Sequence, residues 1–177
     1  MKKEDLYESY ETDRVIIRPT QLDDASFLLE LMNTPKWIRF IGDRKVHSEE
    51  DAKKYMEERM FPQLERLGYS NNTVIRKSDH VKIGTCGLYD REGLDGVDIG
   101  FAFLPQYEGQ GYAFESSNKL MELAQNIWNL RRIGAITLED NKSSQRLLER
   151  LGLRFQKVMK LEEDAEELMY YLWESKK

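Results

Sequence analysis

The strongest constraint on the fold lies between residues 97 and 130, where the hydrophobic period changes. Residues 97–104 alternate as in a β-strand. One face would carry Val97, Ile99, Phe101 and Phe103, and the other Asp98, Gly100, Ala102 and Leu104. From residue 112 the apolar side chains recur at helical spacing. The sequence therefore predicts a strand, a turn containing Gly109 and Gly111, and a long helix over residues 112–130.

The rest of the chain is predicted to form strands and helices in an α/β order. Strands are expected at residues 15–18, 73–76, 81–89, 132–138 and 167–174. Helices are expected to begin at Asp23, Ser48 and Asn141. Together with strand 97–104, segments 73–76 and 81–89 predict an antiparallel meander, and the whole order predicts a mixed sheet.

Helix ends and loops follow from the glycines and prolines. Pro62 is expected to interrupt or end the second helix, and Gly152 to end the last one. Residues 36–40 are expected to form a loop, in which Trp37 and Phe40 either pack on the core or line a substrate side. No internal repeat or linker interrupts the chain, so one domain over residues 1–177 is expected.

Composition excludes several classes of protein. No segment approaches the roughly 20 apolar residues that span a bilayer, and residues 1–13 lack the apolar core of a signal peptide. A cytoplasmic location without a membrane partner is expected. The net charge of −5 argues against nucleic-acid binding. Cys86, His47 and His80 make no metal-ligand cluster, so no metal is expected, and Cys86 is predicted to be a small buried residue.

The glycine loop is a candidate anion-binding site. A helix N-terminus offers unpaired N–H groups and the positive end of the helix dipole, and glycines leave room for a ligand. A Walker loop would need a Gly-Lys-Ser/Thr ending that is absent, and a dinucleotide fingerprint would need a third glycine where Phe114 stands. The pattern Gln106-x-x-Gly109-x-Gly111 instead fits a Gln/Arg-x-x-Gly-x-Gly/Ala loop at every position.

That loop resembles the acyl-CoA pyrophosphate loop of the GNAT superfamily of N-acetyltransferases. Further segments, in chain order, are similar to the RimJ/RimL-type branch, which includes ribosomal-protein N-terminal acetyltransferases. They are Thr12-Asp13-Arg14-Val15-Ile16-Ile17-Arg18, Asp98-Ile99-Gly100-Phe101, Gly109-Gln110-Gly111-Tyr112-Ala113-Phe114-Glu115, and Asn141-x-x-Ser144 followed by Leu148-Glu149-Arg150-Leu151-Gly152-Leu153. The resemblance covers nearly the whole chain and implies the α/β (α+β) GNAT fold, a mixed, mostly antiparallel sheet with a splayed central strand pair and flanking helices.

The resemblance also implies acetyl transfer from acetyl-CoA to an amine, without a metal. Main-chain groups of Phe103 and Leu104 would bind the pantetheine arm of CoA. The pyrophosphate would be bound by loop residues Gln106, Gly109, Gln110, Gly111, Tyr112 and Ala113. Asn141 either only caps its helix or also bonds the pantetheine arm. Glu108, an acid inside the loop, is expected to point to solvent.

The predicted catalytic residues are Ser144, Asp98 and Glu139. The resemblance places Ser144 near the CoA sulfur, where its hydroxyl would hydrogen-bond the leaving thiolate; the alternative is an ordinary first-turn serine. Asp98 and Glu139 are candidate bases for the amine. Glu115 is a third candidate, although an acid in a first turn also stabilises the helix dipole. A water chain without a dedicated carboxylate remains a further alternative.

The sequence thus predicts an N-acetyltransferase, with a protein N-terminal α-amine as the first acceptor. The alternatives are a small-molecule amine of the polyamine or aminoglycoside type, and a non-catalytic acyl-CoA-binding module. A nucleotide-binding protein using the same glycines is disfavoured by the absent Walker lysine and third glycine. A homodimer is compatible with this branch, although no residue pattern indicates one.

Overall fold

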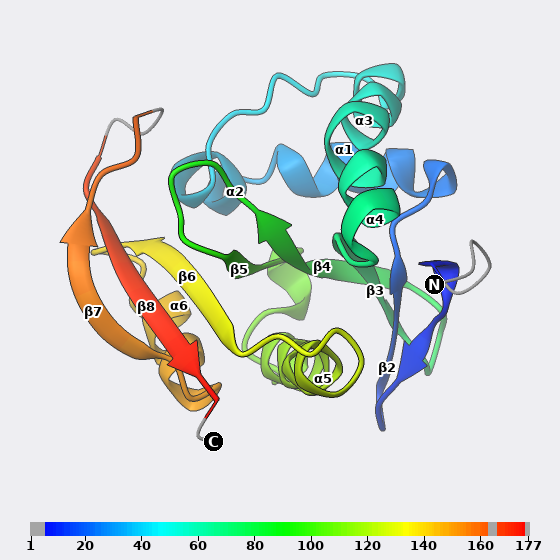
Figure 1. Cartoon of the computed structure of the whole chain (residues 1–177). Helices are drawn as coiled ribbons and strands as arrows, with labels where there is room; N and C mark the ends of the chain where they lie inside the picture. The colour runs from blue at the N-terminus through cyan, green and yellow to red at the C-terminus, as the bar shows by residue number, and fades with distance from the viewer. Residues whose placement is uncertain (1–5, 163–165, 176–177) are drawn as a thin grey trace.

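The computed structural model describes residues 6–162 and 166–175, which contain one eight-stranded sheet in the order β1-β2-β3-β4-β5-β6-β8-β7 (Figure 1). Its strands are β1 (Tyr10–Glu11), β2 (Val15–Pro19), β3 (Asn71–Arg76), β4 (Lys82–Asp90), β5 (Val97–Phe103), β6 (Arg132–Leu138), β7 (Arg154–Met159) and β8 (Leu168–Glu174). Only β5 and β6 pair in parallel, and the other neighbours are antiparallel. The predicted mixed, mostly antiparallel sheet and its β3–β4–β5 meander are confirmed.

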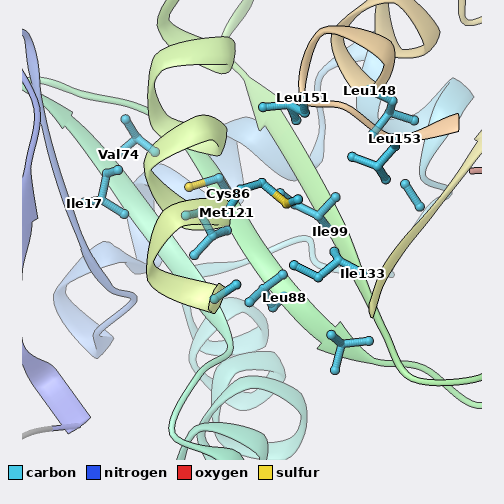
Figure 2. Packing of buried hydrophobic residues seen from close by; sticks show 14 of the residues in the cluster. Ile17, Val74, Cys86, Leu88, Ile99, Met121, Ile133, Leu148, Leu151 and Leu153 are labelled. Atoms are coloured by element: carbon cyan, nitrogen blue, oxygen red, sulfur yellow. The ribbon is translucent and has the colours of Figure 1, made fainter. Parts of the chain in front are cut away.

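Helices cover both faces of the sheet. On one face lie α5 (Tyr112–Asn126) and α6 (Lys142–Arg150), and on the other α1 (Ala25–Met32), α2 (Pro35–Phe40), α3 (Glu49–Tyr55) and α4 (Phe61–Leu67) (Figure 1). Two hydrophobic cores result. The α5-side core includes Cys86, Leu88, Ile99, Met121, Ile133 and Leu148 (Figure 2). The α1-side core includes Leu28, Leu31, Ala52, Met56 and Leu104.

The alternation of β5 divides its side chains between these cores. Val97, Ile99 and Phe103 are buried in the α5-side core, and Phe101 packs against it. Ala102 and Leu104 contact the α1-side core instead. The predicted two-faced strand is therefore confirmed, and both of its faces are covered by helices.

The central strands β5 and β6 separate after a very short ladder. They pair only at Val97↔Ile133 and Asp98↔Gly134. Beyond these two positions β5 continues beside β4 as far as the Gly84↔Phe103 pair, and β6 continues beside β8 as far as Leu138↔Leu168. The predicted splayed central pair is confirmed, and its opening faces the carboxyl ends of both strands.

Two predictions about helices were wrong. Residues 35–40 form α2 rather than a loop, because the Thr34 side chain caps the Trp37 N–H and Pro35 occupies the first turn. Pro62 does not end the second helix, since it lies in the first turn of α4, where its missing N–H has little cost. The interruption is a π-helical turn, Met56–Met60, between α3 and α4.

Other differences lie at element ends. Asp23 does not cap α1, because a 3₁₀ turn, Leu22–Asp24, precedes that helix. The edge strands β1 and β7 were not predicted; β7 is almost wholly exposed and lacks the alternation that marks a half-buried strand. The caps Ser48 and Asn141 were predicted correctly, and each side chain accepts a backbone N–H from its own helix.

A buried carboxylate ties the N-terminal strands to α1. Asp24 has no exposed surface and accepts two 2.8 Å bonds from Arg18 of β2. It also accepts a 2.7 Å ion-pair contact from Lys82 of β4 and a 2.9 Å bond from Thr73 of β3. Burial alone would raise the pKa of Asp24, but the bonds from Arg18 and Lys82 outweigh it and lower that pKa well below the usual range.

We predict that Asp24→Asn lowers the free energy of unfolding at pH 7 by about 3–5 kcal/mol, the usual cost of removing one partner of a buried ion pair. Because the folded-state pKa is depressed, this stabilisation exists above the unfolded-state pKa and disappears as the pH falls below about 4. Urea unfolding of wild type and variant between pH 3 and 7 measures both effects.

Asp95→Asn is the matched control. Asp95 bonds Arg132 at 2.6 Å, but its side chain is 85% exposed, so the loss should stay below about 1 kcal/mol. Equal losses of unfolding free energy in the two variants would show that the buried Asp24 cluster stabilises the fold no more than an exposed ion pair does.

Candidate active site

The glycine loop has the backbone shape that the sequence predicts. After Leu104 the chain makes a 3₁₀ turn, Pro105–Tyr107, and Gly111 is the N-cap of α5. Gly109 and Gly111 have φ angles of +69° and +86°, in the left-handed region that favours glycine. The exposed side chain of Gln110 donates a 2.9 Å bond to the Gln106 carbonyl and closes the loop on itself.

The backbone N–H groups of residues 109–114 have no acceptor within the described parts of the chain. The Glu108 N–H bonds Pro105, and the next N–H with a protein acceptor is that of Glu115, which bonds the Gly111 carbonyl at 3.0 Å. Space beside the loop is open, since a Cβ at Gly109 would meet no atom within 4 Å. Consecutive free N–H groups at the start of a 15-residue helix are suited to bind an anion such as a pyrophosphate.

Two acids next to this loop are neutralised by cations. Glu108 forms an ion pair with Lys36 of α2, and its side chain is 31% exposed. Contrary to the prediction, it does not project freely into solvent. Glu115 accepts bonds from the Thr12 hydroxyl at 2.6 Å and from the Arg14 backbone N–H and Nε at 2.9 and 2.6 Å. Burial would raise the pKa of Glu115, but the bonds from Thr12 and Arg14 lower it overall. A carboxylate with three donors is poorly suited to act as a base.

The second wall of the opening is the end of β6 and the start of α6. Asn141 is half-buried, and its Oδ1 accepts the Ser144 N–H at 3.3 Å and the Ser143 hydroxyl at 3.2 Å. Within the described residues, neither the Asn141 side-chain amide nitrogen nor the Ser144 hydroxyl has a hydrogen-bond partner. Both groups can therefore bond a ligand. Glu139 is exposed at the rim of the same turn.

Helix α2 connects the two walls. Lys36 pairs with Glu108 on the β5 side, and Arg39 bonds Asp140 on the β6 side at 2.8 Å. Arg39 also bonds Glu166, which precedes β8, at 2.8 Å. Trp37 and Tyr55 pack against the α1-side core, whereas Phe40 packs in a third cluster with Leu94 and Leu161. Of the two alternatives for Trp37 and Phe40, packing on the core or lining a substrate side, the structure shows packing for both.

Asp98 lies at the closed end of the splay. It is 2% exposed and accepts bonds of 3.1 and 3.2 Å from Nε and Nη2 of Arg91. Burial raises the pKa of Asp98 even though Arg91 opposes that shift. Along the strand, Asp98 is five residues from Phe103, or about 17 Å at 3.3 Å per residue. The structure therefore separates Asp98 from the loop and from Ser144 and Glu139, which lie at the open end.

Two tyrosines that sequence reasoning missed flank Asp98. Tyr89 pairs directly with Asp98 across β4 and β5, and its ring covers Gly100, where a Cβ would lie 2.9 Å from the ring. The ring of Tyr170 covers Gly134, the β6 partner of Asp98, at the same 2.9 Å. Burial is the main cause of the raised pKa of both tyrosines, and the charge of Asp98 is one of several smaller contributions. Glycines at inward-facing strand positions were the available signal for such ring packing.

Cys86 is unsuitable as a nucleophile. It has no exposed surface, lies between β4 and α5 beside Met121 (Figure 2), and burial raises its pKa to about 12. His47 and His80 are exposed. Among the described residues, no group of three or more His, Cys, Asp and Glu side chains is placed to hold a metal ion. In the same residues, no helix is long and apolar enough to cross a membrane.

Comparison with known proteins identifies the family. A family model described as an acetyltransferase (GNAT) domain matches residues 14–154. The chain therefore belongs to the GNAT acetyltransferases, and it is an acyl-CoA-dependent N-acetyltransferase. It is 28% identical over 143 residues to the uncharacterized N-acetyltransferase YnaD of Bacillus subtilis (strain 168), a match that covers 81% of each chain.

Solved structures share the fold at lower identity. A GNAT-family acetyltransferase from Bacillus anthracis superimposes with a TM-score of 0.78 at 23% identity, covering 94% of this chain and 98% of the other. A ribosomal-protein-S5-alanine acetyltransferase from Vibrio fischeri gives 0.71 at 18% identity, with coverage of 94% and 96%. The microcin C7 self-immunity acetyltransferase MccE, in complex with acetyl-CoA and AMP, gives 0.77 at 18%, with coverage of 93% and 94%.

We predict that native protein will not react measurably with a soluble thiol reagent such as DTNB at pH 8 over minutes, because Cys86 is buried and remains a protonated thiol. One equivalent should react after unfolding in guanidinium, since Cys86 is the single cysteine. Stoichiometric reaction of the folded protein would contradict the burial of Cys86.

Proposed function

We propose that this protein transfers the acetyl group of acetyl-CoA to a protein N-terminal α-amine, as a RimJ/RimL-type enzyme whose single GNAT domain comprises residues 1–177 and acts in the cytoplasm. The use of acetyl-CoA is supported by one observation: residues 109–114 have free backbone N–H groups, and they lie beside two strands that separate after two paired positions. The acceptor part is supported by the motif resemblance and by the shared fold of the Vibrio fischeri enzyme, whose name states a ribosomal-protein substrate.

The cofactor would extend from the loop into the splay. N–H groups of Gly109 to Ala113 would bind the pyrophosphate, with Gln106 and Gln110 shaping the loop. The main chain of Phe103 and Leu104 would pair with the pantetheine arm, although the Leu104 N–H already bonds the Ile83 carbonyl at 3.0 Å. The free side-chain amide of Asn141 would reach the arm from the β6 wall. These contacts require no metal.

In the proposed reaction, acetyl-CoA supplies an activated acetyl group. Residues of the chain stabilise the charge that develops and accept or donate protons. The amine nitrogen forms a bond to the acetyl carbon while the carbon–sulfur bond breaks. A backbone N–H at or near Phe103 would stabilise the developing oxyanion. Because Asp98 lies about 17 Å along β5 from Phe103, the proton lost by the amine would reach it only through bound water, or would stay with water. The Ser144 hydroxyl would hydrogen-bond the thiolate, which takes a proton from water.

Glu139 lies nearer the open end of the splay, but Asp98 fits the role of base better by its burial and raised pKa. Burial keeps the pKa of Asp98 above its ordinary value, which favours proton uptake, and Asp98 lies on the face that carries the α1–α4 layer. Glu139 is exposed at the rim. Direct transfer to an amine bound on that face requires no covalent enzyme intermediate, which agrees with a buried Cys86.

We predict that the protein binds acetyl-CoA and CoA but not ATP in isothermal titration. Gly111→Glu should weaken acetyl-CoA binding at least about 100-fold, because it places a like charge in the phosphate site. Gly96→Glu is the control for backbone strain and added charge, since Gly96 also has a positive φ, of +89°, but lies in the β4–β5 hairpin. Its Cβ position is open, whereas that of Gly111 lies 3.1 Å from Nη2 of Arg14. Binding of ATP without CoA would refute the proposal.

We predict that Asp98→Asn lowers kcat by about 10²–10⁴-fold with little change in the acetyl-CoA Kd, whereas Glu139→Gln changes neither. In wild type, kcat/KM should rise with pH through a pKa above the ordinary aspartate value, because the deprotonated carboxylate is the active form. The reverse pattern in the two variants would assign Glu139 as base, and unchanged rates in both would leave the role to water.

The acceptor is tested with a panel of peptides and small amines. N-terminal peptides should give a higher kcat/KM than polyamines or aminoglycosides. Preference for a small amine would identify the alternative acceptor class, and acetyl-CoA binding without any transfer would identify a non-catalytic acyl-CoA-binding module. A homodimer is compatible with the branch, and sedimentation of the purified protein tests it.

A further inference from the structure

We propose that Arg14 is a positioning residue of the cofactor loop, holding the peptide unit between Gln110 and Gly111 so that the Gly111 N–H points into the phosphate site. This inference rests on the proposed acetyl-CoA site at residues 109–113. Arg14 belongs to the turn between β1 and β2, about 100 residues upstream of the loop, and its contacts with the loop are visible only in the folded chain.

The guanidinium of Arg14 is fixed against the loop. Its Nη1 donates a 2.9 Å bond to the Gln110 carbonyl, and its Nε donates a 2.6 Å bond to Glu115 in the first turn of α5. Its central carbon lies 4.4 Å from the centre of the Tyr112 ring. Its Nη2 lies 3.1 Å from where a Cβ at Gly111 would be. A carbonyl, a carboxylate and an aromatic face together define one orientation for this side chain.

Through the geometry of the peptide unit, this contact fixes the orientation of the Gly111 N–H. In a trans peptide the C=O and N–H groups point in opposite directions. The Gln110 carbonyl and the Gly111 N–H belong to one peptide unit, so a bond from Arg14 to the carbonyl directs the N–H away from Arg14. No peptide bond in the described chain is cis. A cation on the carbonyl also polarises the peptide unit and makes its N–H a stronger donor. Arg14 would thus prepare one donor of the phosphate site without touching the phosphate.

Thr12 and Glu115 hold Arg14 in this position. Glu115 accepts the Thr12 hydroxyl at 2.6 Å and the Arg14 backbone N–H at 2.9 Å, in addition to the guanidinium. Glu115 is only 18% exposed in its side chain, and it anchors the β1–β2 turn to the start of α5. The positive charge of Arg14 also offsets the negative charge of Glu115 four residues from the loop peptide. Glu115 therefore acts through Arg14 rather than on the acceptor amine.

The test measures binding of acetyl-CoA, dephospho-CoA and S-acetylpantetheine to wild type, Arg14→Ala and Arg14→Lys. We expect Arg14→Ala to raise the acetyl-CoA Kd about ten- to a hundredfold, as for loss of a hydrogen bond to a charged group. Arg14→Lys should recover part of the affinity. Dephospho-CoA should lose as much as acetyl-CoA, whereas S-acetylpantetheine, which lacks the pyrophosphate, should bind all three proteins equally.

Arg76→Ala is the matched control, because Arg76 also contacts tyrosines of the loop region: it lies 4.8 Å from the Tyr107 ring centre and beside the Tyr112 hydroxyl. It donates to Asp79, however, and to no loop carbonyl. It should leave the acetyl-CoA Kd nearly unchanged. In the free protein, the NMR amide signal of Gly111 should move upfield in Arg14→Ala and stay in place in Arg76→Ala, because only the first loses carbonyl polarisation.

Four outcomes would overturn the inference. The first is an unchanged acetyl-CoA Kd in Arg14→Ala. The second is an equal loss for S-acetylpantetheine, which would mean a general effect on the fold. The third is an effect that vanishes with dephospho-CoA, which would mean that Arg14 contacts the 3′-phosphate directly. If wild type binds no CoA species, the proposed function itself fails and the inference falls with it.

Discussion

The structure depends on one constraint, the pairing of β5 with β6 at only two positions. A longer parallel ladder would satisfy the main chain of both strands and leave no opening in the sheet. Because the strands separate, each leads at its carboxyl end into a helix start, α5 after the glycine loop and α6 after Asn141. Helix N-termini attract anions. The break in the sheet therefore sets the location of the proposed acyl-CoA site and the groups that line it.

Charge around the opening is balanced by pairs that join distant parts of the chain. Glu108 and Glu115 are acids beside the proposed phosphate site. Each is paired with a cation, Glu108 with Lys36 from α2 and Glu115 with Arg14 from the β1–β2 turn. Without these partners the two carboxylates would repel a pyrophosphate. The same pairs tie α2 and the N-terminal hairpin to the loop, so the proposed cofactor site and the packing of the N-terminal region share contacts.

Periodicity and turn chemistry predicted most of the sheet. Strands 97–104 and 132–138 were placed within a residue of their observed ends, because the apolar pattern of a strand is a local signal. Strand β7 was not predicted, because an exposed edge strand needs no apolar face and so lacks the alternating pattern. Helix α2 was not predicted, because the short segment between Pro35 and Gly42 suggested a loop, whereas Thr34 and Pro35 in fact start a helix. The π-helical turn before Pro62 has no sequence signature that periodicity can detect.

By itself, the sequence determined the family, the glycine loop and the residue types available for chemistry, because those depend on spacing within short segments. Tertiary structure alone decided which of these residues meet. It placed Asp98 with Arg91, Tyr89 and Tyr170 at the closed end of the splay, and Ser144 with Asn141 at the open end. It also brought Arg14 to Gln110. Such contacts join residues up to 100 positions apart, and only the register and packing of a whole sheet bring them together.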